Sequence, residues 1–147
     1  MAVTVPRKPA HGARAKARRL AMQALYQWQM TATEGSELVA QFEASEEFGG
    51  ADRDYFEELV YRVIDQAAEL DGLYEGDLDR PLAEVDPVEK AVLRIAAYEL
   101  AHRIDLPYRV VLNEAINLTR KYGADQAHTF VNGVLDKLAR RLRVHER

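Results

Sequence analysis

The sequence contains no cysteine. Disulfide bonds, thiolate metal sites and mechanisms with a cysteine nucleophile are therefore excluded. No apolar run approaches the ~18 consecutive apolar residues that a membrane-spanning helix requires. Only eight glycines and five prolines occur in 147 residues, which argues against an all-β fold because such folds need a turn every ~8–12 residues. With 48% hydrophobic and 30% charged residues, the composition is typical of a globular protein built from helices.

The common catalytic and nucleotide-binding motifs are also absent. The sequence holds no G-x-G-x-x-G, no P-loop and no G-x-S-x-G motif. None of its four histidines lies four residues from another, so a helical zinc-binding pair is missing. Glu99 and His102 form one Glu-x-x-His pair, whereas a di-iron site in a helical bundle needs two such pairs and two further glutamates. We therefore expect no catalytic residues, no metal site and no cofactor.

Apolar residues recur at helical spacing over most of the chain. The pattern predicts an all-α protein of about seven helices, and the clearest helices cover 15–30, 37–46, 56 to about 72, 87–101, 108–122 and 126–142. The fourth of these has the clearest start, with Asp86 as N-cap and Pro87 at the first helical position. Its residues 91–101 are apolar on every face, so we expect other helices to surround it.

The expected organisation is a mobile basic arm followed by one helical domain. The arm covers residues 1–13, which contain two prolines and a glycine and show no apolar periodicity. The domain covers 14–147 and consists of two small helical bundles that share a core. A hinge around Pro81 divides it into subdomains of about 14–80 and 81–147. Two glycines carry further expectations: Gly123 as a helix C-cap, and Gly133 as a point of close helix packing, since glycine destabilises a helix interior.

Charge is distributed unevenly along the chain, although the net charge is only −4. Residues 1–33 hold six basic residues and no acidic one. Residues 34–89 hold eighteen acidic residues against three basic ones, and residues 90–147 are basic again. Such a chain can present a basic surface to a polyanion and an acidic surface to a cationic partner, although plain solubility explains the same pattern.

Two features indicate nucleic-acid binding. Four basic residues lie close together where the arm becomes a helix, and no acidic residue stands among them. Such a group is typical of phosphate contacts, and its members are Arg14, Lys16, Arg18 and Arg19. In the last helix, Phe130 lies on a stripe with Lys137 and Arg141, an arrangement that suits stacking on an unpaired base. The alternatives are a solvated face for the basic cluster and core packing for Phe130.

Four separated segments resemble the NusB family of bacterial transcription antitermination factors. They are RRLAMQALYQW at 18–28, VEKAVLRIAAYEL at 88–100, PYRVVLNEAI at 107–116 and FVNGVLDK at 130–137. The resemblance spans nearly the whole chain, and the acidic region 31–79 contributes little to it. It implies a non-enzymatic, all-α protein that binds the boxA element of nascent single-stranded RNA together with NusE, a small-subunit ribosomal protein. It further implies that the protein joins a complex that keeps RNA polymerase elongating through ribosomal RNA operons.

The resemblance also assigns residues. By motif, the RNA side comprises Arg14, Lys16, Arg18 and Phe130, and the NusE side includes Tyr26 and Glu89. Basic residues alternate with alanine at positions 14–18, where the family often has a denser arginine cluster. Arg19 is therefore a candidate to replace one phosphate contact. Gln126 occupies a loop position that is often acidic in relatives, and the loss of that repulsion is expected to strengthen RNA binding.

The sequence is compatible with two other functions. The same fold resembles the RNA-binding accessory domain of some RNA cytosine methyltransferases, which would accompany a Rossmann-like catalytic part and a nucleophilic cysteine. A structural helical oligomerisation module is the other. Because Arg18 and Arg19 interrupt the apolar run near the N-terminus, no signal peptide is recognised, and we expect a cytoplasmic protein without a membrane partner.

Overall fold

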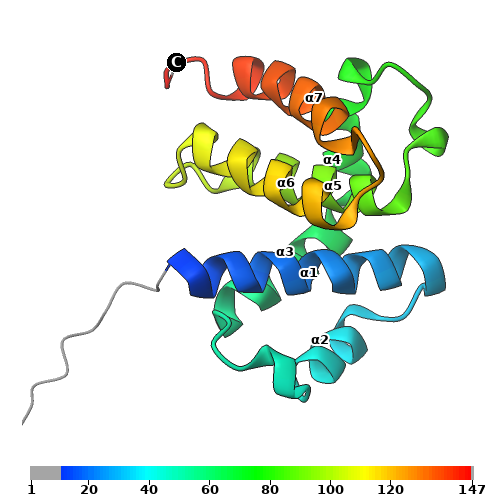
Figure 1. The fold of residues 1–147 in the computed structure, drawn as a ribbon, viewed down its shortest axis with the longest axis vertical. Helices are drawn as coiled ribbons and strands as arrows, with labels where there is room; N and C mark the ends of the chain where they lie inside the picture. The colour runs from blue at the N-terminus through cyan, green and yellow to red at the C-terminus, as the bar shows by residue number, and fades with distance from the viewer. Residues whose placement is uncertain (1–10, 147) are drawn as a thin grey trace, which may run out of the picture.

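The computed structural model describes residues 11–146. Within this range it contains seven α-helices and three short 3₁₀ turns and no strand, which confirms the all-α prediction (Figure 1). None of these helices is both long and apolar enough to cross a membrane. The helices are α1 His11–Thr31, α2 Gly35–Glu43, α3 Arg53–Asp65, α4 Ala67–Tyr74, α5 Pro87–His102, α6 Tyr108–Tyr122 and α7 Ala127–Leu142; the 3₁₀ turns are η1 Glu46–Phe48, η2 Glu75–Asp77 and η3 Leu82–Glu84.

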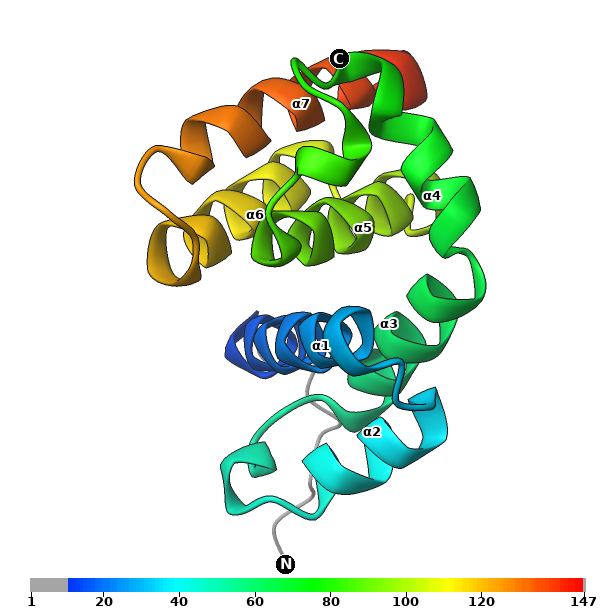
Figure 2. The ribbon, with the colours of Figure 1, turned by 90° about the vertical axis from the view of Figure 1, so that its right-hand side faces the viewer.

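The helices gather into two groups, seen one above the other in Figure 2. One group contains α1, α2 and α3, and the other contains α4, α5, α6 and α7. Helix α5 packs against α1, α3, α4, α6 and α7, which confirms that its apolar surface is surrounded on all sides. Helix α4 precedes the expected hinge at Pro81 and packs on α5 and α7. The division into subdomains 14–80 and 81–147 stays a prediction. Of the expected arm 1–13, residues 1–10 lie outside the described residues, whereas residues 11–13 already belong to α1 and not to an arm.

The predicted continuous helix from 56 to about 72 is wrong. Helix α3 ends at Asp65, and Gln66 leaves the helical conformation with φ −110° and ψ 14° before α4 begins. No proline or glycine marks this break in the sequence. Packing explains it, because α3 lies mainly against α1 whereas α4 turns to meet α5 and α7. Tertiary contacts here override a continuous local pattern.

Both ends of α5 are held by specific hydrogen bonds. At its start, the Asp86 carboxylate accepts a hydrogen bond from the Val88 backbone N–H at 2.9 Å, which confirms the predicted N-cap. At its end, the buried guanidinium of Arg143 donates to the carbonyls of Glu99, Leu100, Arg103 and Leu106 over 2.7–3.2 Å. The last carbonyls of a helix have no partner within it, so this arginine satisfies them and ties the end of α7 to α5.

Two glycines differ from each other in the space around them. Gly123 caps α6 as predicted, at φ −86°, and a Cβ there would lie 2.7 Å from the Thr119 carbonyl oxygen. Glycine is therefore required at position 123 because the Thr119 backbone lies so close, and not because the residue adopts a left-handed conformation. At Gly133 a Cβ would meet nothing within 4 Å, so the expected close helix packing is wrong.

These two glycines yield a matched stability test. We expect Gly123→Ala to lower the free energy of unfolding by about 1–3 kcal/mol, because the added methyl group overlaps a carbonyl oxygen. Gly133→Ala should instead raise it by up to ~1 kcal/mol, because alanine favours the helix and has room. Urea unfolding followed by circular dichroism measures both, and equal effects of the two substitutions would contradict the packing described here.

Candidate nucleic-acid interface

The four basic residues at the start of α1 do not share one surface. They all lie within the helix, where positions three or four apart face the same side. Arg14 and Arg18 form one such pair and turn toward Tyr55 of α3, with guanidinium centres 5.1 and 5.6 Å from its ring centroid. Lys16 and Arg19 form the other pair and contact the segment around η1. The structure therefore divides the predicted cluster in two.

Arg18 is placed in the interior. Its side chain is 4% exposed, and its Nε and Nη2 donate to Glu99 of α5 at 3.0 and 2.7 Å. Its Nη1 lies 3.5 Å from a carboxylate oxygen of Glu114 in α6. The Tyr55 hydroxyl donates to the same Glu99 carboxylate. In contrast to the expected phosphate contact, the guanidinium faces two carboxylates inside the protein, because an arginine at this depth needs charged partners.

The buried guanidinium of Arg18 keeps its charge. Burial by itself lowers the pKa of Arg18, but the charge and hydrogen bonds of Glu99 outweigh burial, and the pKa lies above its usual value. Burial and the neighbouring Glu99 raise the pKa of the Tyr55 hydroxyl, so it remains a donor. Sequence reasoning missed this pair, although one signal was present: Glu99 stands in the apolar stretch of α5, and a buried carboxylate requires a cation.

Lys16 and Arg19 line a groove of about 470 Å³ between α1 and α6. We call it the basic groove, and its other lining residues include Asn117, Lys121 and Tyr122. Lys16 donates to the Gly49 carbonyl, and Arg19 Nη1 lies 2.8 Å from Glu47, whose side chain is 59% exposed. Because Glu47 is exposed, this ion pair contributes little to stability.

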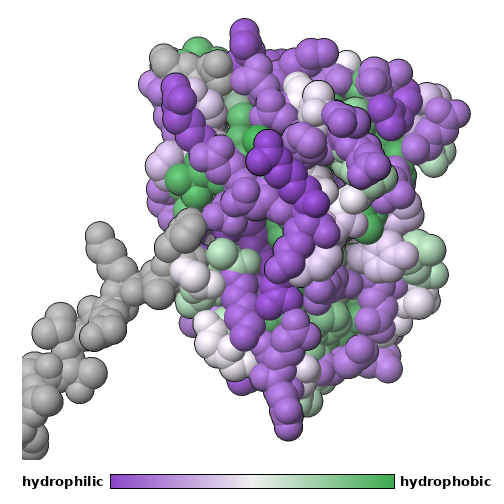
Figure 3. All heavy atoms as spheres, in the orientation of Figure 1, coloured by the Kyte–Doolittle hydropathy of each residue, from purple (hydrophilic) through white to green (hydrophobic). Residues whose placement is uncertain are grey.

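The sequence prediction did not include Lys121 and Tyr122. They bring a cation and an aromatic ring to the same groove, with the Lys121 ammonium 5.5 Å from the Tyr122 ring centroid. Their position in the last turn of α6, facing the start of α1, depends on how the two helices cross. Figure 3 shows that polar side chains dominate the face of the molecule on which α1, α6 and α7 lie.

Gln126 and Phe130 follow the basic groove along the chain. Gln126 is exposed in the loop after α6, adopts the left-handed conformation at φ 67°, and its carbonyl accepts from the backbone of Thr129 and Phe130. Phe130 is half-buried and packs against the core. The guanidinium of Arg80 covers its ring, with the central carbon 4.0 Å from the ring centroid.

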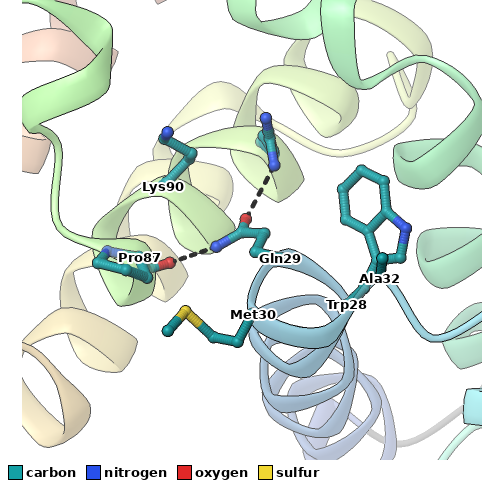
Figure 4. A pocket seen from close by; sticks show the side chains of 7 residues that line it. Trp28, Gln29, Met30, Ala32, Pro87 and Lys90 are labelled. Carbon is teal, nitrogen blue, oxygen red and sulfur yellow. Dashed lines mark hydrogen bonds between the residues drawn. The ribbon is translucent and has the colours of Figure 1, made fainter.

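The two predicted partner residues differ in exposure. Tyr26 is 38% exposed on α1, and Met30, one turn further, is 57% exposed. Met30 lines a pocket of about 350 Å³ between the end of α1 and the start of α5 (Figure 4). Inside it, Gln29 donates to the Pro87 carbonyl at 2.8 Å and accepts from Arg94 at 3.0 Å.

Glu89, which the resemblance assigns to the NusE side, is buried, with 5% of its surface exposed. Burial raises the pKa of its carboxyl group, and the neighbouring charge of Asp86 raises it further. The carboxylate accepts a hydrogen bond from the Asp86 backbone, which opposes the shift. Glu89 thus closes the first turn of α5. Within residues 11–146, no group of three or more histidine, aspartate or glutamate side chains is arranged to hold a metal ion.

Comparison with known proteins agrees with this architecture. The sequence profile of the NusB family matches residues 15–140. The chain belongs to the NusB family. The transcription antitermination protein NusB of Idiomarina loihiensis is 53% identical over 130 residues, which cover 88% of this chain and 92% of that protein. The corresponding Marinomonas protein is 50% identical over 135 residues, 90% of this chain and 78% of its own length.

Solved structures of family members share the fold. NusB from T. maritima superposes with a TM-score of 0.76 at 28% identity, covering 86% of this chain and 90% of that chain. A structure of antitermination factors NusB and NusE in complex with double-stranded RNA superposes with a TM-score of 0.75 at 25% identity, covering 89% of this chain and 98% of that chain. The family consists of non-enzymatic antitermination factors, in line with the predicted fold and function class.

The interior position of Arg18 leads to a stability prediction. We expect Glu99→Gln, which leaves the size of the side chain unchanged, to lower the free energy of unfolding by about 3–5 kcal/mol, since it leaves a buried guanidinium without its main partner. As a control, Arg140→Ala removes an exposed arginine paired with Asp136 and should change it by at most ~0.5 kcal/mol. Chemical denaturation measures both. A loss below 1 kcal/mol for Glu99→Gln would contradict the buried pair.

Glu89 leads to a prediction on pH. Because the folded chain raises the pKa of this carboxyl group, it binds the proton more tightly than the unfolded chain does. The contribution of Glu89 to the free energy of unfolding therefore decreases as the pH rises from the ordinary pKa of glutamate through the raised pKa of the folded chain. Glu89→Gln should be more stable than the wild type at pH 7, and the difference should shrink toward pH 4.

Thermal unfolding between pH 4 and pH 7 measures that difference. Glu37→Gln on the exposed side of α2 is the control and should follow the wild type at each pH. A difference between Glu89→Gln and the wild type that does not depend on pH would contradict the assignment.

Proposed function

We propose that this protein is a transcription antitermination factor that binds boxA-type single-stranded RNA jointly with the ribosomal protein NusE. It acts in the cytoplasm, in the elongation complex with RNA polymerase. The observation that carries the proposal is the family relationship, which covers residues 15–140 and includes a relative described in complex with NusE and RNA. No feature of the described residues favours a methyltransferase accessory domain or an oligomerisation module over this function.

The RNA surface that we propose is centred on the basic groove. Lys16, Arg19 and Lys121 supply three cations at its edges, and Tyr122 supplies an aromatic ring. Phosphate contacts provide most of the affinity for single strands, and aromatic rings add stacking that tolerates any base. The loop with Gln126 and the first turn of α7 with Phe130 continue the surface, and Arg14 flanks it on α1. Arg18 supports this surface from the interior.

The NusE surface that we propose lies at the other end of α1. Exposed Tyr26 and Met30 and the pocket between α1 and α5 provide an apolar contact. Acidic residues, which dominate the sequence between 34 and 89, provide a surface suited to a basic ribosomal protein. Glu89 contributes by fixing the first turn of α5 beside the pocket. We also propose that the basic segment 1–10 adds phosphate contacts and that the hinge near Pro81 separates two subdomains.

Salt dependence tests the RNA surface. For single strands, log affinity falls against log salt with a slope of about −0.7 per phosphate contact. We therefore expect the triple variant Lys16→Ala, Arg19→Ala and Lys121→Ala to bind boxA RNA more weakly and to flatten the slope by about 2 units. Fluorescence anisotropy with labelled RNA, with and without NusE, measures both quantities.

The control for this experiment is Arg109→Ala together with Arg140→Ala, which removes two exposed arginines outside the groove. It should leave the slope near that of the wild type. If the groove variant retains the affinity and the salt slope of the wild type, the basic groove is not the RNA surface. Double-stranded RNA of the same sequence shows whether the surface prefers unpaired strands.

A further inference from the structure

Arg80 lies over the ring of Phe130, although 49 residues separate them in the sequence. Arg80 belongs to the connection between η2 and η3, where no helix fixes the backbone. Its guanidinium carbon is 4.0 Å from the ring centroid, whereas the other cation–aromatic contacts of residues 11–146 measure 5.0–5.6 Å. This distance corresponds to direct contact between the two groups.

The contact changes what the surface offers to a ligand. With the guanidinium in place, a base cannot reach the covered face of Phe130. The Arg80 side chain itself is 37% exposed, so part of the side chain that covers the ring stays open to solvent. A guanidinium is planar and weakly hydrated, and unpaired RNA bases stack on such planes as they do on aromatic rings.

The partners of Arg80 leave it available to a ligand. Asp79 accepts from its Nε at 2.7 Å and from its Nη2 at 3.4 Å, and this carboxylate is 69% exposed, so the pair is weak. Within residues 11–146, no hydrogen bond reaches Nη1 of Arg80. Arg141 differs, since Asp77 and the Leu73 carbonyl hold its guanidinium at 2.7 Å. The acids whose charge reaches Arg80 are Asp79, Glu84 and Glu89.

We propose that Arg80 is a base-stacking residue of the RNA interface, and that Phe130 acts as a positioning residue that holds the guanidinium plane toward the RNA. An unpaired base stacks on the outer face of the guanidinium, and Nη1 is free to donate to a phosphate or a base edge. The inference rests on the proposed function and extends it to a residue outside the basic groove. Pre-organisation by Phe130 reduces the ordering that binding requires.

Three substitutions separate the contributions of the guanidinium plane of Arg80, of its charge and of the Phe130 ring. Arg80→Lys keeps the charge and removes the plane, Arg80→Ala removes both, and Phe130→Leu keeps an apolar side chain and removes the ring. Affinity for labelled single-stranded boxA RNA is measured on the full chain in the presence of NusE over a range of salt concentrations.

We expect Arg80→Lys to weaken RNA binding by roughly fivefold or more with an unchanged salt slope, since stacking and not charge is lost. Arg80→Ala should weaken it at least as much and flatten the slope by about 0.7. Phe130→Leu should weaken binding in the wild-type background and add little in the Arg80→Lys background, because both changes disrupt one stack. The matched control is Arg140→Lys on α7, which should bind RNA like the wild type.

RNAs with a single abasic position identify the stacked base. When the stacked base is missing, the wild type should bind the RNA more weakly than it binds intact RNA. Arg80→Lys should bind both RNAs with the same affinity. The proposal is overturned if Arg80→Lys binds RNA as the wild type does, or if Phe130→Leu has its full effect in the Arg80→Lys background. It is also overturned if the Arg80 variants weaken NusE binding without RNA, which would make this a protein-binding surface. If the wild type itself binds no boxA RNA, the proposed function fails first, and the two failures are therefore distinguishable.

Discussion

The buried ion pair between Arg18 and Glu99 joins the two groups of helices. Arg18 comes from α1 and Glu99 from α5, and they meet at 2.7 Å with almost no exposed surface. Tyr55 of α3 donates to the same carboxylate, and Glu114 of α6 lies 3.5 Å from the guanidinium. Four helices therefore converge on one charged contact. Charges at this depth are tolerated only with paired, hydrogen-bonded geometry, so the contact restricts how these helices can be arranged.

That restriction reaches the surface at the basic groove. The groove lies between α1 and α6, and Glu114 belongs both to its lining and to the buried cluster. Moving α1 relative to α6 would separate Arg18 from Glu114 and would also change the spacing of Lys16 and Arg19 from Lys121. The interior charges thus determine the distances between the exterior ones. A single helix supplies both sets, because Arg18 is buried while Lys16 and Arg19 line the groove.

Much of the fold follows from local sequence signals. The helical periodicity, the Asp86 cap and the all-round apolar surface of α5 depend on neighbouring residues, and each was predicted. The features that were missed depend on residues far apart in sequence. Arg18 and Glu99 are 81 positions apart, and Arg80 covers Phe130 from a connection that carries no regular pattern. The acid-free run at 14–19 looks uniform in sequence, and only long-range partners separate the buried Arg18 from its half-buried basic neighbours.

Helix α1 also explains how two partners can bind together. Its 21 residues span ~30 Å at 1.5 Å per residue. Lys16 and Arg19 lie in its first half beside α6. Tyr26 and Met30 lie in its second half, where Met30 lines the pocket at the start of α5. An RNA strand and a protein at these two proposed sites would contact the same helix without competing for it. Because Arg18 ties α1 to α5 and α6 beside the first of these proposed sites, the length of the helix sets the distance between the two.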